Sequence, residues 1–149
     1  MVTEEQVRQY REEGYVVVRG LLSPEEAAAY RAEAHALIGR LEKIKHTNAT
    51  WGAARAQSAA TKIHHCHDVQ FESAALGRLI LDARLADAFS ALMGSPNVQL
   101  HHNKLFIKPP EKGSPFPMHQ DKPFFPHDND TMMAAIVHFD DAPLEKGCV

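Results

Sequence analysis

Apolar positions in the first third of the chain repeat with the period of an α-helix. Thr3-Glu4-Glu5-Gln6 fits a capping box, so we predict a short helix that runs to Glu13 and ends at Gly14. Ser23-Pro24-Glu25-Glu26 is a second capping box with proline at the first helical position, and it predicts the start of a longer helix. The apolar residues at helical spacing in that helix are Tyr30, Ala34, Leu37, Ile38 and Leu41.

The rest of the chain predicts one further helical stretch and several extended segments. Helical spacing runs from Phe71 to Met93, with a restart near Asp82 and an end at Gly94. Strands are predicted at residues 15–18, within 97–108 and at about 131–139, and a loop at about 43–60. Helices followed by strands favour an α+β arrangement over alternating βαβ units.

Composition excludes several classes of protein. A chain of 149 residues with 44% hydrophobic content is typical of one ordinary domain with a core. Its formal charge is -3 and no stretch concentrates lysine and arginine, so nucleic acid is not an expected partner. The acidic start is not a secretory signal and no apolar run reaches bilayer length, so we expect a cytoplasmic protein with no membrane partner. Two cysteines are too few for a disulfide framework, and we expect reduced thiols.

Histidine is abundant, with ten residues, and one of them belongs to the triplet His119-Gln120-Asp121. In an extended segment residues i and i+2 point to the same face, so His119 and Asp121 would present an imidazole and a carboxylate together. With one more histidine they would complete the 2-His-1-carboxylate triad that holds Fe(II) and leaves positions open for a co-substrate and O2. Alone, the triplet is a weak pattern, and a surface loop with both side chains solvated is the favoured interpretation.

Three ordered segments resemble the phytanoyl-CoA dioxygenase family. The segment Lys104 to Pro110, followed by a glycine-containing loop and His119-Gln120-Asp121, is similar to the family's Lys-Pro-Pro segment before its metal-binding His-Gln-Asp. Residues 144–149, Leu-Glu-Lys-Gly-Cys-Val, resemble the family's run before a Pro-Gly-Ser-His segment. Residues 14–23 resemble its N-terminal strand and helix cap.

The resemblance implies an Fe(II)- and 2-oxoglutarate-dependent dioxygenase that uses O2 to hydroxylate a small organic or acyl substrate. His119 and Asp121 would bind iron, and the carboxylate at Asp121 favours hydroxylation over halogenation. Lys62 would lie beside the 2-oxoglutarate pocket, although a solvated lysine flanking a helix is an equal alternative. Lys104 and Ile136 would line that pocket, and Gln120 would support the ligand strand or touch the co-substrate.

The implied fold is α+β, a double-stranded β-helix (a cupin-like jelly roll) with N-terminal helices on its outer face. We expect residues 1–149 to form one such domain, truncated on the C-terminal side, because about four predicted strands fall short of the roughly eight that a jelly roll needs. The family's second histidine and its 2-oxoglutarate-anchoring arginine fall beyond Val149, and His127 and His138 lie too near the triplet to replace that histidine. A fragment, a mis-terminated reading frame, or a protomer that self-associates through exposed strand edges would each account for this.

Two alternatives belong to other classes. A non-catalytic module of the same fold would have lost oxidation chemistry, because two ligands and no anchoring arginine hold iron weakly. A zinc-binding interaction protein would use His64-His65-Cys66-His67, but structural zinc sites space their ligands in pairs, so a polar segment beside the pocket is the favoured interpretation. The sequence leaves the substrate open.

Overall fold

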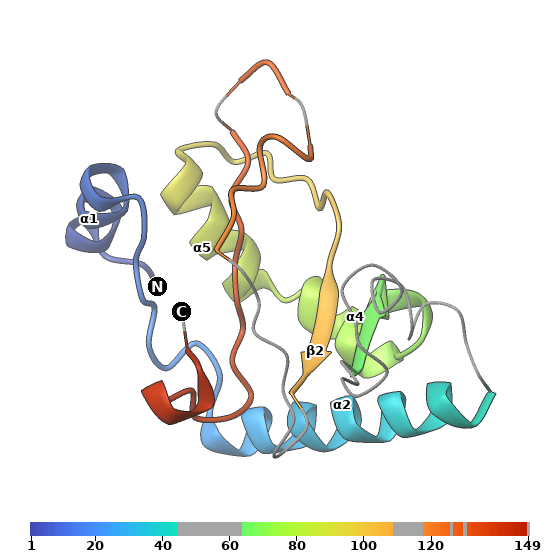
Figure 1. The fold of residues 1–149 in the computed structure, drawn as a ribbon. Helices are drawn as coiled ribbons and strands as arrows, with labels where there is room; N and C mark the ends of the chain where they lie inside the picture. Colours follow the sequence, from blue (N-terminus) through green and yellow to red (C-terminus); the bar gives the residue numbers. More distant parts are fainter. Residues whose placement is uncertain (45–63, 109–117, 126, 130, 149) are drawn as a thin grey trace.

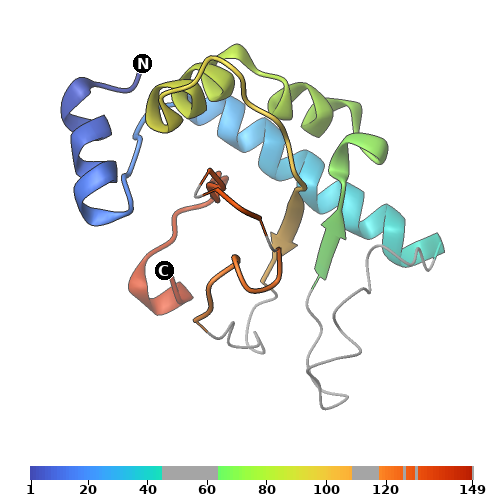
Figure 2. The same ribbon diagram turned by 90° about the horizontal axis from the view of Figure 1, so that it is seen from above.

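The computed structural model describes residues 1–44, 64–108, 118–125, 127–129 and 131–148. In chain order the elements are α1 (Glu4–Glu13), α2 (Pro24–Ile44), β1 (His64–His67), η2 (Val69–Phe71), α4 (Ala74–Ile80), α5 (Ala83–Met93), β2 (Lys104–Ile107) and η3 (Leu144–Lys146). Strands β1 and β2 pair antiparallel in a two-stranded sheet, and Figure 2 shows helices α2, α4 and α5 on one side of this sheet and the C-terminal segment on the other side.

Helices α1, α2 and α5 begin where the sequence predicts, whereas α4 begins at Ala74 and not at Phe71, which lies in the short helix η2. Thr3 Oγ1 accepts a hydrogen bond from the Gln6 amide at 3.2 Å, and Gln6 Oε1 accepts one from the Thr3 amide at 2.9 Å. Gly14 ends α1 with φ of 80°, a conformation that glycine adopts without strain. The predicted restart is confirmed as well, since Asp82 caps α5 and Gly94 ends it.

Helix α2 runs along one edge of the fold beside β1 and β2 (Figure 1), and it contributes four of the eight buried residues in the core cluster of the described chain. Leu37 and Leu41 are each 1% exposed, and Cys66 of β1 and Leu105 of β2 are buried in the same cluster. Burial of the Cys66 thiol raises its pKa to about 11, so this cysteine is an apolar core residue and not a nucleophile. The two-stranded sheet is therefore packed against α2 through one of its two faces.

Two strands form the sheet of the described residues, fewer than the four or so expected, although the α+β class is confirmed. The predicted strand at 15–18 is wrong, because this segment pairs with no strand of the described chain and Tyr15 and Val17 are 60% and 58% exposed. The strand at 131–139 is wrong for the same reason, and within 97–108 only residues 104–107 enter a ladder. An extended segment becomes a strand only where a partner satisfies its backbone. The expected loop at about 43–60 lies outside the described residues, apart from the last turn of α2.

Side chains, and not a ladder, attach the C-terminal segment to the helices. Tyr30 of α2 and Phe139 stack with ring centroids 5.7 Å apart, and Arg31 Nε donates to Asp140 Oδ1 at 2.5 Å. Lys108, just after β2, donates to the Gly147 carbonyl at 2.9 Å.

Among the helices that the structure describes, none is both long and apolar enough to cross a bilayer.

Replacement of Leu37 tests whether α2 anchors the fold. We expect Leu37→Ala to lower the free energy of unfolding by about 2–5 kcal/mol, because it leaves a cavity in the centre of the core. Leu81→Ala is the matched control, since Leu81 is 84% exposed, and it should change stability by less than about 0.5 kcal/mol. Urea unfolding followed by circular dichroism measures both, and equal losses would contradict this description of the core.

Arg84 joins the start of α5 to the start of α2. Its guanidinium donates to Glu26 Oε1 and to Asp82 Oδ2, both at 2.7 Å, and to the Leu21 carbonyl at 3.0 Å. These hydrogen bonds lower the pKa of Glu26 and of Asp82 to about 2. Each carboxylate therefore contributes stability above its unfolded pKa of about 4, and that stability is lost as pH falls toward 2.

Thermal unfolding at several pH values tests this network. We expect Arg84→Met to lower the melting temperature most above about pH 5, and the difference from the wild type to shrink as pH falls toward 2. Arg78→Met replaces an exposed arginine on α4, and any difference that it makes should not depend on pH in that window. A deficit of Arg84→Met that stays constant from pH 5 to pH 2 would show that the carboxylates are not involved.

Candidate metal centre and its surroundings

His119 and Asp121, called here the ligand pair, have side chains that converge. His119 Nε2 lies 3.5 Å from Asp121 Oδ1, and the two side chains are 41% and 39% exposed. The backbone of residues 118–120 is in no sheet, and a turn follows in which the Asp121 carbonyl accepts from the amides of Phe124 and Phe125 at 2.9 and 3.1 Å. An imidazole nitrogen beside a carboxylate oxygen, open to solvent, is a donor set that fits a divalent transition metal.

The ligand pair is two donors and not three. Within the described parts of the chain, no group of three or more His, Cys, Asp or Glu side chains is close enough to hold a metal ion. His127 instead lies in the loop after the pair, where its Nδ1 is 2.6 Å from the Phe125 carbonyl, and His138 is an exposed side chain of the C-terminal segment. The role of the ligand pair in iron binding therefore stays a prediction.

Lys104 is the predicted pocket residue that the structure relates to the ligand pair. Its side chain is partly buried, and burial lowers the pKa of its ammonium while the negative charge of Asp121 opposes that change. Gln120 is exposed, and Ile136 is 66% exposed, so neither is enclosed in a pocket. Lys62 lies outside the described residues.

The face of the two-stranded sheet that points away from α2, called here the donor face, consists of His65, His67, Lys104 and Phe106. The antiparallel register pairs His65 with Phe106 and His67 with Lys104, whereas the alternate residues Cys66 and Leu105 point into the core. The rings of His65 and His67 lie 5.4 Å apart, and the Lys104 ammonium is 4.5 Å from the centre of the Phe106 ring. His65 is only 4% exposed. Burial, and then the positive charge of Lys104, lower the pKa of His67, which favours its neutral form near pH 7.

Sequence reasoning missed the donor face. From the sequence, residues 64–67 are interpreted as a polar stretch beside a pocket, because their spacing does not fit a structural zinc site. This segment has no alternation of apolar and polar residues, and without the register of β2 its sequence does not show which side chains face away from the core.

Asn103 fixes the register of the two-stranded sheet. Its Oδ1 accepts from the Val69 amide at 3.0 Å, its Nδ2 donates to Gln70 Oε1 at 2.6 Å, and its carbonyl accepts from the Asp68 amide at 3.1 Å. These bonds join the end of β1 to the start of β2. They also hold Asp68 in a left-handed turn, with φ of 52°, which few residues other than glycine adopt.

Aromatic contacts join the loop after the ligand pair to the segment that enters β2. The Phe125 ring lies 5.1 Å from the His101 ring and 4.8 Å from the His102 ring. Because the Phe125 amide also donates to the Asp121 carbonyl, one residue connects the backbone of the ligand pair to the strand that contains Lys104. Histidine rings in this chain therefore act as packing surfaces as well as candidate ligands.

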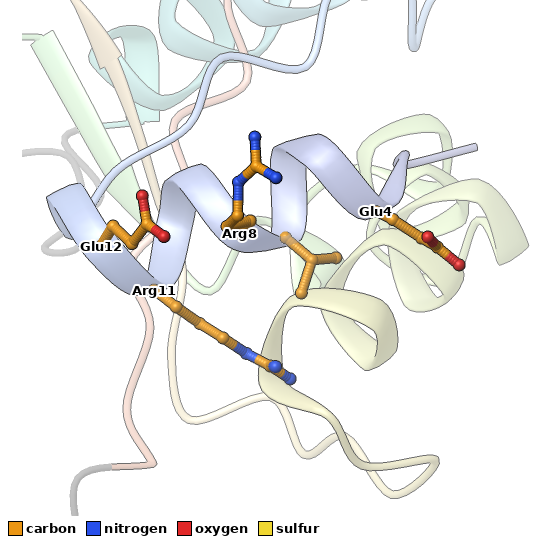
Figure 3. A pocket seen from close by; sticks show the side chains of 5 residues that line it. Glu4, Arg8, Arg11 and Glu12 are labelled. Carbon is orange, nitrogen blue, oxygen red and sulfur yellow. The ribbon is translucent and has the colours of Figure 1, made fainter.

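The surface hollows on the described chain lie elsewhere and are weak candidates. One, on the outer surface of α1, is lined by Glu4, Val7, Arg8, Arg11 and Glu12, and Figure 3 shows Arg8 and Arg11 extending to opposite sides of the helix. Arg8 pairs with Glu5, and Arg11 lies beside Gly94 at the end of α5.

Comparison with known proteins identifies a family for this chain. The profile of the family Phytanoyl-CoA dioxygenase (PhyH) matches residues 10–149. The chain therefore belongs to the phytanoyl-CoA dioxygenase family, which is a family of dioxygenases.

Individual relatives are distant and longer. The chain is 25% identical to a probable alpha-ketoglutarate-dependent hypophosphite dioxygenase of Stutzerimonas stutzeri, over 97% of this chain and 50% of that protein. It is 29% identical to an ectoine dioxygenase of Bordetella bronchiseptica (80% and 37%) and 28% identical to the peroxisomal phytanoyl-CoA dioxygenase of Rattus norvegicus (82% and 38%). The chain thus spans half or less of the length of these relatives. No solved structure matches it significantly.

Replacement of Asn103 tests what sets the register between β1 and β2. We expect Asn103→Ala to destabilise the protein by about 1–3 kcal/mol, because it leaves the Val69 amide without its acceptor. Hydrogen exchange at Val69 and Leu105 should accelerate together with that loss. Asn97→Ala removes the same side chain at an exposed position and serves as the control. Unchanged exchange in Asn103→Ala would show that the strands pair without this residue.

Proposed function

We propose that this protein is an Fe(II)- and 2-oxoglutarate-dependent dioxygenase in which His119 and Asp121 supply two of the iron ligands. The observation that supports this most is the 3.5 Å approach of the two side chains, in a chain whose family consists of dioxygenases. The name of one relative states dependence on alpha-ketoglutarate, which is 2-oxoglutarate.

In this proposal each residue of the site has one task. The imidazole of His119 and the carboxylate of Asp121 hold the metal on one side and leave its other positions open. The Lys104 ammonium, in partly desolvated surroundings, binds a carboxylate of 2-oxoglutarate, and Gln120 and Ile136 border the same pocket, with Lys62. Iron, when bound together with 2-oxoglutarate and O2, supplies the oxidising chemistry that hydroxylates a small organic or acyl substrate.

The proposed fold around this site is a jelly roll, in which β1 and β2 are two of the strands and α2 covers the face that contains Cys66 and Leu105. A third iron ligand and an arginine for the far carboxylate of 2-oxoglutarate complete the site in the whole enzyme. Self-association through strand edges and a cytoplasmic location remain predictions. A non-catalytic module of the same fold is the competing function, because the described residues offer two metal donors.

Anaerobic addition of Fe(II) and 2-oxoglutarate to the protein tests the proposal. We expect a charge-transfer absorption band in the visible region, which requires the metal and the co-substrate on one site. His119→Ala and Asp121→Ala should each weaken Fe(II) binding by more than about tenfold, since even loss of a residue that only supports a ligand costs that much.

His138→Ala is the control for histidine removal, because His138 is exposed on the C-terminal segment and is predicted to bind no metal. It should leave the band unchanged. Absence of the band in the wild-type protein would favour the non-catalytic module. A band that survives in both His119→Ala and Asp121→Ala would place the metal elsewhere in the chain.

A further inference from the structure

Two adjacent phenylalanines follow the ligand pair, and the structure gives them different surroundings. The Phe124 side chain is 70% exposed, and its ring lies 6.4 Å from the His119 ring, edge to face. Phe125 is only partly exposed, and its ring packs on the rings of His101 and His102, at 5.1 and 4.8 Å. Phe125 is therefore the member of the pair that attaches this turn to another part of the chain.

The backbone of Phe125 is held on both sides. Its amide donates to the Asp121 carbonyl at 3.1 Å, and that carbonyl also accepts from the Phe124 amide at 2.9 Å. Its own carbonyl lies 2.6 Å from His127 Nδ1 and can only accept, so that nitrogen carries the proton. These hydrogen bonds close a turn that begins at Asp121, and a displacement of Phe125 would open this turn.

The histidine rings that contact Phe125 are themselves connected to the core. Nδ1 of His101 and Nδ1 of His102 lie 2.7 Å apart, so one imidazole donates to the other and each ring restrains its neighbour. The next residue, Asn103, accepts from the Val69 amide at 3.0 Å, and Val69 belongs to the core cluster. Aromatic rings attract each other at centroid distances of about 4.5–7 Å. A continuous series of contacts thus joins the turn to the core.

We propose that Phe125 is a positioning residue for the ligand pair: its ring, packed on the two histidine rings, keeps the Asp121 carboxylate beside the His119 imidazole. The inference rests on the proposed function, because it assigns a task within that site. The ligand pair belongs to no strand of the described chain, so contacts from outside the turn must hold its geometry. Residues that hold a metal ligand in place influence metal affinity although they do not touch the metal.

The first test uses the metal-free protein. NMR measures how fast the amides at positions 124 and 125 exchange with solvent, because both donate to the Asp121 carbonyl. We expect Phe125→Ala to accelerate this exchange by about twofold to tenfold, the range that loss of one hydrogen bond gives. Exchange at the Val69 amide should not change, since Val69 is bonded to Asn103 and not to the turn.

A double-mutant cycle tests whether the ring acts through its contact with the histidines. His102→Ala removes one partner ring, and Phe125→Ala in the same background should then cause little additional acceleration. Phe125→Tyr keeps an aromatic ring and should retain most of the wild-type protection. Phe71→Ala is the matched control, because it removes the same side chain at a position that is 81% exposed, and it should not change exchange at positions 124 and 125.

The second test adds Fe(II) and 2-oxoglutarate in the absence of O2. We expect Phe125→Ala to weaken Fe(II) binding by about tenfold or more, as substitutions that disturb the support of a metal ligand do, and Phe125→Tyr to lose less. Phe71→Ala should bind as the wild type does. Circular dichroism verifies that each variant is folded, so that a loss of binding is not caused by unfolding.

Several results would overturn the inference. These are wild-type amides at positions 124 and 125 that exchange as fast as in an unfolded chain, equal exchange in Phe125→Ala and the wild type, additive effects of Phe125→Ala and His102→Ala, or equal Fe(II) affinity in Phe125→Ala and the wild type. The metal-free test gives its result whether or not iron binds. Accelerated exchange in Phe125→Ala, together with no absorption band in the wild type, would support the positioning of the two side chains and contradict the proposed function alone.

Discussion

Cys66 and Leu105 lie opposite each other on β1 and β2, and both pack against Leu37 and Leu41 of α2. This contact decides which way the remaining side chains of β1 and β2 point, because side chains alternate along a strand. A shift of one residue in register would bury His67 and expose Cys66, at a large cost in free energy. The donor face is therefore a consequence of core packing, and Asn103 supports the same register from outside the core.

The ligand pair depends on a second, weaker constraint. Within the described residues, His119 and Asp121 pair with no strand, and two features position them: the turn at Asp121 and the contact of Phe125 with His101 and His102. Partial exposure of both side chains leaves room for an ion and for further ligands. A metal site of this kind would be organised by its metal as much as by the protein.

The sequence predicted the features that depend on neighbouring residues. The capping boxes at Thr3 and Ser23, the restart at Asp82 and the glycine end at Gly94 are all local, and the structure contains each of them. The approach of the His119 and Asp121 side chains is also local, since it follows from a spacing of two residues.

Long-range pairing was not predictable in the same way. Residues 15–18 have a strong β pattern and form no strand, whereas His64–His67 has none and pairs with β2. The difference lies in whether a partner segment is present, which no window of one sequence reveals. The resemblance to the family predicts roles for the ligand pair and Lys104, whereas the shared face of His65 and His67 emerged only from the register. The jelly roll itself stays a proposal, because two strands do not define a barrel.

The central claim is that one metal ion binds between the imidazole of His119 and the carboxylate of Asp121. Its most direct test is the titration of the protein with Mn(II), a paramagnetic substitute for Fe(II), followed by residue-resolved NMR line broadening. The claim predicts that resonances of residues 118–122 broaden first, followed by those of Lys104, while α1 stays sharp. Broadening centred on His64–His67 or on His101 and His102, with 118–122 unaffected, would contradict it.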